Sequence, residues 1–166
     1  MINFGTMNYT HIHLLINHLA LFGTLFGGLI LTFGFIKKSD SSIVIAYYLF
    51  VISALGAVVA YFTGEEAEES IENIQGISHD AISMHEDLAF YAYLATLFLG
   101  LLSIIGLWLT HINSKSIRKI ALITILVSFI SFCLVVRTAY LGGQIRHTEL
   151  HFDTSDQEED LFEKNN

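Results

Sequence analysis

The chain has 166 residues, of which 53% are hydrophobic and only 14% are charged, and its mean hydropathy is +0.57. This composition excludes a disordered chain, which needs low hydrophobicity and high charge, and argues against an ordinary water-soluble domain. The formal net charge of −8 argues against a nucleic-acid-binding surface. The single cysteine, Cys133, excludes an intramolecular disulfide, a CxxCH haem attachment motif and a cysteine-rich zinc site.

Four apolar segments are each long enough for a membrane-spanning helix, which needs about 20 mostly apolar residues. In chain order they are Leu14–Ile36, Ile43–Phe62, Leu88–Leu109 and Ile120–Gly142. The first three contain no Asp, Glu, Lys or Arg, and the fourth contains only Arg137. No sequence repeat is convincing. Because the connections at 37–42 and 110–119 are short, the sequence predicts an all-α, up-down-up-down four-helix transmembrane bundle over residues 1–150, followed by an acidic tail at 151–166.

The charges in the connections predict the orientation of this bundle. The two short connections contain basic residues, at Lys37, Lys38, Lys115, Arg118 and Lys119. The loop at 63–87 contains no Lys or Arg and eight acidic residues. Because positively charged residues favour the cytoplasmic side, we expect both termini and the acidic loop to be extracytoplasmic.

The segment 64–77 combines glutamates with a helical apolar spacing. Ala67, Ile71 and Ile74 recur at i, i+4 and i+7, which predicts a short amphipathic helix on the outer membrane surface. Clustered carboxylates and imidazoles can bind a divalent metal. The candidate metal ligands are Glu65, Glu66, Glu86, His147 and Glu149. The alternative is a solvated acidic surface without a site.

Seven of the eight histidines lie on the predicted outer side, at the ends of three helices. They are His11, His13, His18, His79, His85, His147 and His151. His18 lies about one helical turn inside the first segment, and His85 precedes the third. An ionisable residue in a membrane span indicates a functional site by default. Neutral imidazole binds haem iron and transition metals and relays protons. A structural or capping role is the alternative for His18.

Haem is the sharpest interpretation of this histidine pattern. A b-type haem needs two axial imidazoles on facing helices and polar or basic groups near the surface for its propionates. Arg137 and Arg146 are the only outer-side arginines in or near a span, so either could pair with a propionate. The alternative for Arg137 is a buried ion pair with Glu65, Glu66 or Glu86.

Four segments carry a resemblance to a known family. They are HLLINHLAL with His13 and His18, TGEEAEE at 63–69, MHED at 84–87 and GGQIRHTEL at 142–150. Together they resemble a group of uncharacterised bacterial four-helix membrane proteins, often labelled predicted haem-binding and grouped by fold with the di-haem membrane cytochromes b. The resemblance implies a haem b electron-transfer role in the bacterial inner membrane. It marks His18 and His85 as first-choice ligands and also marks His13, His147 and Glu149.

Three functions follow from these observations. The first is a membrane cytochrome b that passes electrons between a quinol or periplasmic donor and a partner, as an electron-transfer subunit rather than an independent enzyme. The second is a His/Glu divalent-metal site or ion pathway at the outer face. The third is a non-catalytic subunit of a larger membrane complex. The sequence has no GxSxG, P-loop or GxGxxG motif, so it gives no sign of a hydrolase or a nucleotide-binding domain.

Overall fold

The computed structural model describes residues 9–69 and 79–164, and it describes side chains at residue 13 and over 15–64 and 82–144. Four helices account for these residues: α1 (Tyr9–Lys37), α2 (Asp40–Glu69), α3 (His79–His111) and α4 (Ile117–Lys164). All four are long and apolar enough to cross a membrane, by length and composition. The structure therefore confirms the all-α prediction and supports a multi-pass membrane protein.

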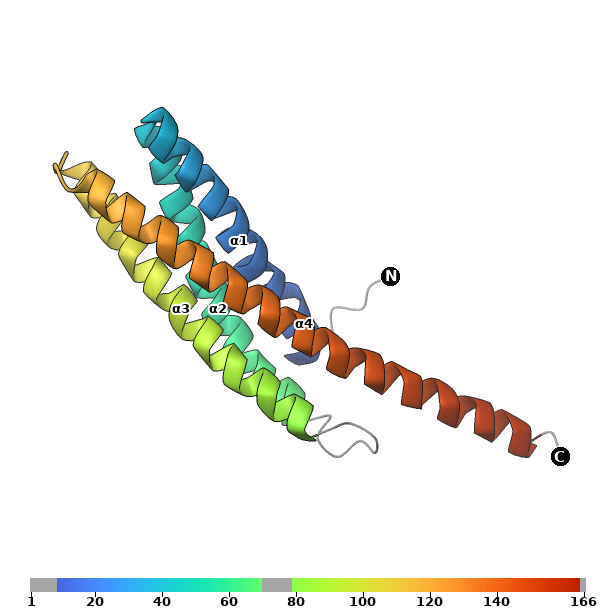
Figure 1. Cartoon of the computed structure of the whole chain (residues 1–166). Coiled ribbons are helices and arrows are strands. Elements are labelled where there is room, and N and C mark those ends of the chain that lie inside the picture. Colours follow the sequence, from blue (N-terminus) through green and yellow to red (C-terminus); the bar gives the residue numbers. More distant parts are fainter. Residues whose placement is uncertain (1–8, 70–78, 165–166) are drawn as a thin grey trace.

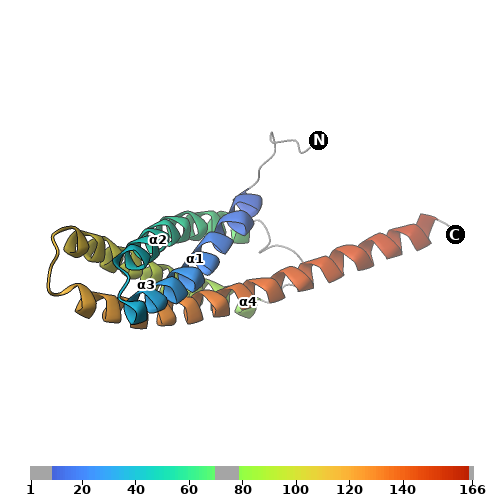
Figure 2. The same ribbon diagram turned by 90° about the horizontal axis from the view of Figure 1, so that it is seen from above.

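The helices pack side by side, each against the next along the chain, and α4 returns to pack against α1 (Figures 1 and 2). The diagonal pairs α1–α3 and α2–α4 meet much less. The two short connections lie together at one end of the structure, whereas α1 begins, α2 ends and α3 begins at the other end (Figure 1). This arrangement is compatible with the predicted four-helix bundle.

The helices α1 and α3 end in the same type of C-terminal cap, at the two short connections. Lys38 and Asn113 adopt positive φ angles of 57° and 52°. The next residue in each case reaches back to the last turn of the helix, through Ser39 N to Gly34 O (2.9 Å) and Ser114 N to Leu109 O (3.0 Å). These are Schellman caps, which satisfy the carbonyls that a helix end leaves unpaired. They reverse the chain within a few residues and so make the paired helices antiparallel.

The side chains are sorted in the way expected for helices in lipid. Large apolar residues face outward on every helix, with Leu55 63% exposed and Phe129 69% exposed. The buried positions are instead rich in small and hydroxyl residues, including Ala20, Thr24, Ala46, Ser53, Ala92, Thr96, Thr124 and Ser131. Lipid is as apolar as leucine, so burial of leucine does not drive packing there, and small residues allow close approach of the backbones.

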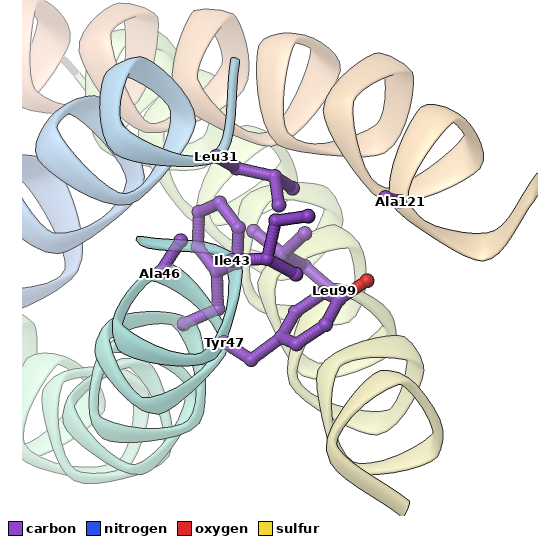
Figure 3. Close-up of a cluster of buried hydrophobic side chains, with 7 residues drawn as sticks. Leu31, Ile43, Ala46, Tyr47, Leu99 and Ala121 are labelled. Atoms are coloured by element: carbon purple, nitrogen blue, oxygen red, sulfur yellow. The ribbon is translucent and has the colours of Figure 1, made fainter. Parts of the chain in front are cut away.

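The largest buried side chains gather toward the end with the short connections. Figure 3 shows Leu31 of α1, Tyr47 of α2 and Leu99 of α3 converging there, with Ala121 of α4 beside them. Arg118, at the start of α4, lies 4.4 Å from the centroid of the Phe35 ring of α1 and donates to the Phe35 carbonyl at 3.3 Å. These contacts close the ring of helices at this end. The opposite end carries His13, His18 and His85 and is called the histidine end below, whereas His111 lies beside the α3–α4 connection.

The helices extend beyond the predicted spans at the histidine end. Residues 64–69, the first part of the predicted amphipathic segment, continue α2 without a break. The rest of that segment, 70–77, lies outside the described residues. The tail from residue 151 is helical through Lys164 as a continuation of α4, which projects beyond the other three helices (Figures 1 and 2).

Candidate functional site

His85, near the start of α3, is the one buried histidine among the side chains that the structure describes, with 7% of its surface exposed. Its Nδ1 lies 3.1 Å from the backbone carbonyl oxygen of Thr138 on α4. The ring also packs against Gly142, where a Cβ atom would lie 2.9 Å from its Cε1. The missing side chain of this glycine therefore makes room for the imidazole.

His13, near the start of α1, is held in the same manner. Its Nδ1 lies 2.8 Å from the backbone carbonyl oxygen of Ala60 on α2, and its ring is half-buried. A Cβ atom on Gly64 would lie 3.0 Å from the Cε1 of this ring. An electrostatic interaction links His13 to His85, so the two imidazoles lie near each other at the same end of the structure.

These hydrogen bonds determine which ring nitrogen carries the proton. A carbonyl oxygen can only accept a hydrogen bond, so the Nδ1 atoms of His13 and His85 are the donors. In the neutral ring, Nε2 then carries the lone pair. Histidines that bind metals usually donate their other ring N–H to a carbonyl or carboxylate, which orients the ring and makes the ligand more basic. Both rings therefore have the tautomer of a metal-binding histidine.

The structure places His18 differently. Its ring is exposed on the outer face of α1 and stacks on Phe22, with ring centroids 6.1 Å apart. Phe22 stacks in turn on Phe26. His18 is thus the first of a row of aromatic side chains on the exposed face of α1, which also carries large apolar side chains. Of His13 and His18, the one that the structure brings to His85 is His13.

Arg137 and Glu86 are the charged candidates with described side chains, and both are exposed on the surface of the bundle. Arg137 is exposed, and its guanidinium lies 5.7 Å from the ring centroid of Tyr140, one turn later in α4. Glu86 is exposed beside the buried His85. Both side chains have an apolar stem and a polar end, which suits a position near the surface of a membrane.

The remaining candidates lie outside the described side chains. They are Glu65, Glu66, Arg146, His147 and Glu149. Among the side chains that the structure does describe, no three His, Cys, Asp or Glu residues form a group that could hold a metal ion. The carboxylate-rich metal site predicted at the outer face therefore has no support within that part of the chain, and it stays a prediction for the rest.

Sequence reasoning missed the two glycines that accommodate the histidines. Gly64 and Gly142 lie within the segments TGEEAEE and GGQIRHTEL, which were noted for their charged residues. A glycine costs about 1 kcal/mol in a helix relative to alanine, so a glycine in a helical segment indicates a close approach. That was the available signal.

In comparisons with protein-family models, curated proteins and solved structures, no match to this chain was found.

Proposed function

We propose that this protein is a b-type haem protein of the bacterial inner membrane that passes electrons between a quinol or periplasmic donor and a partner protein. The observation that carries the proposal is the buried His85 imidazole, oriented by the Thr138 carbonyl in the tautomer that binds a metal. Haem would supply a one-electron redox centre within the bundle.

The residues around His85 fit this role in their chemistry. Its donor atom is neutral and soft enough for iron, and the neighbouring glycine leaves the ring room against α4. Burial and the hydrogen bond at Nδ1 would both contribute to the reduction potential of a bound haem. Arg137 and Arg146 remain the proposed partners of the propionates.

A difference spectrum tests the proposal directly. Protein purified in detergent after haem-replete expression should show the sharp reduced bands of a b-type cytochrome in a dithionite-reduced minus oxidised spectrum. His85→Ala should lose those sharp bands, because the haem iron would lose an axial ligand. His111→Ala, which changes an exposed histidine in the last turn of α3 at the opposite end, should keep them. A featureless wild-type spectrum would contradict the proposed function.

We further propose that both termini and the α2–α3 connection face outward, because the basic residues gather at the two short connections. The single cysteine makes this testable by labelling. In a Cys133→Ser background, Asn166→Cys should react with a membrane-impermeant maleimide in spheroplasts. Asn113→Cys, in the α3–α4 connection, should react only after lysis. The reverse pattern would show the opposite orientation.

A further inference from the structure

The two histidine sites have the same construction. In each, a histidine near the start of one helix donates to a backbone carbonyl of the next helix. The residue four positions after that carbonyl is a glycine that faces the ring. His13 meets Ala60 and Gly64 in the hairpin of α1 and α2, and His85 meets Thr138 and Gly142 in the hairpin of α3 and α4.

This equivalence extends from the histidines to Gly34 in α1 and Gly106 in α3. His13 and His85 are 72 residues apart, and each buried residue of α1 has a buried counterpart in α3 at that same separation. The pairs are Ala20 with Ala92, Thr24 with Thr96, Gly27 with Leu99, Leu31 with Ser103 and Gly34 with Gly106. The register fixed by the two histidines therefore also aligns the faces that the two helices bury.

The aligned segments also share their residues. The sequence TLFGGL at 24–29 matches TLFLGL at 96–101 in five of six positions. Thr24 donates to the carbonyl four residues earlier at 2.8 Å, and Thr96 does the same at 2.8 Å. Both acceptors are buried alanines, Ala20 and Ala92.

The second helix of each hairpin follows the same rule with a separation of 78 residues. Every buried residue that the structure describes in α4 pairs with a buried residue of α2. The pairs are Ile43 with Ala121, Ala46 with Thr124, Phe50 with Ser128 and Ser53 with Ser131. Gly64 and Gly142 have the same separation. The change from 72 to 78 is accommodated between Gly106 and Ala121, around the α3–α4 turn, which is longer than the α1–α2 turn.

We propose that the chain is a tandem duplication of one helical hairpin and that its equivalent imidazoles, His13 and His85, together bind a single transition-metal centre between the two halves. Repeats whose helices run in the same direction are related by an axis along the bundle. Two equivalent donors near such an axis can hold one ligand on it. The electrostatic interaction between the two rings agrees with this placement.

The other candidate residues with described side chains have no matching residue in the other repeat. At the same separations, His18 corresponds to Phe90, Glu86 to Leu14 and Arg137 to Val59. A site formed by the duplication therefore contains imidazoles and no carboxylates. Two neutral nitrogen donors suit the iron of a haem, and this choice of ligand rests on the function proposed above. They also suit a bare Cu²⁺ or Zn²⁺ ion.

Titration of the detergent-solubilised full chain tests the shared site, with hemin in one series and with Zn²⁺ or Cu²⁺ alone in another. We expect one hemin per chain and a six-coordinate, low-spin spectrum. His13→Ala and His85→Ala should each convert this spectrum to a five-coordinate, high-spin form, and added imidazole should restore the low-spin form in both. His18→Ala should bind as the wild type does, because that ring lies on the outer face.

The outcomes separate this inference from the proposed function. If hemin does not bind but one Zn²⁺ or Cu²⁺ per chain does, and both variants lose it, then the shared site stands and the haem function falls. Two hemins per chain would overturn the shared site, and so would a His13→Ala variant with the wild-type spectrum. If neither hemin nor a metal ion binds to the folded wild-type chain, both proposals fall.

Discussion

Replacing Gly100 with alanine should lower the free energy of unfolding by about 1–3 kcal/mol, the usual cost of overpacking a tight core. A Cβ atom on Gly100 of α3 would lie 2.5 Å from the Cβ of Ala54 on α2. Both atoms are fixed to their backbones, so no side-chain rotation can relieve the overlap. The helices α2 and α3 must therefore move apart, which should appear as a lower unfolding temperature in detergent.

Two further variants make this test specific. Gly143→Ala adds the same methyl group to a helix where nothing lies within 4 Å of the new atom, so its unfolding temperature should stay level or rise slightly. Ala54→Gly removes the obstructing methyl group, so it should recover much of the stability of Gly100→Ala in a double-mutant cycle. Strictly additive effects of the two changes would contradict the close approach of α2 and α3.

Replacing Gly142 with alanine should weaken binding of the proposed metal centre by about 10- to 100-fold, the range typical for loss of a group that orients a metal ligand. The added Cβ would lie 2.9 Å from Cε1 and 3.4 Å from Nδ1 of His85. The ring must therefore shift, and its hydrogen bond to the Thr138 carbonyl must lengthen. Hemin titration measures the affinity, and ¹⁵N NMR of the histidine rings reports the proton on Nδ1.

The neighbouring residue again provides the control for this change. Gly143→Ala should bind hemin as the wild type does, because it places a methyl group on a different face of the same helix turn. By the proposed duplication, Gly64→Ala should weaken binding to a similar degree through His13. Equal binding by the Gly142 and Gly143 variants, with both chains folded, would contradict the role of Gly142 in positioning His85.

Much of the architecture could be predicted because it depends on the length and polarity of apolar segments. The four segments lie within α1 to α4, and short polar connections could only produce antiparallel neighbours. The ends of the helices were harder to predict. The acidic residues at 64–69 and the tail after 151 end the apolar pattern, but they do not end the hydrogen bonding of the backbone.

The sequence could predict that the candidate site contains histidines, but not which histidine of α1 lies near His85. His13 and His18 are five positions apart, which places them about 140° apart around a helix at 100° per residue. Only one of them can face the interior, and their spacing alone does not show which one. The packing of α1 on α2 decides this, through the carbonyl of Ala60 and the space beside Gly64.

The repeat was hidden for a different reason. The separation of equivalent positions changes from 72 in the first helices of the hairpins to 78 in the second, so no single shift aligns the two halves. Among the buried pairs of α2 and α4, only Ser53 and Ser131 are the same residue. The equivalence became visible only when hydrogen bonds and burial could be compared position by position.

The unbroken course of α4 has a mechanical consequence. Its 48 residues make a rod about 72 Å long, more than twice the roughly 30 Å thickness of the hydrocarbon core. The same rod carries the Thr138 carbonyl that holds His85 and, farther along, the acidic tail. A pull or a twist applied to the tail would thus act on the imidazole. The two adjacent glycines at 142 and 143 are where that rod would bend first, since each lowers helix stability by about 1 kcal/mol relative to alanine.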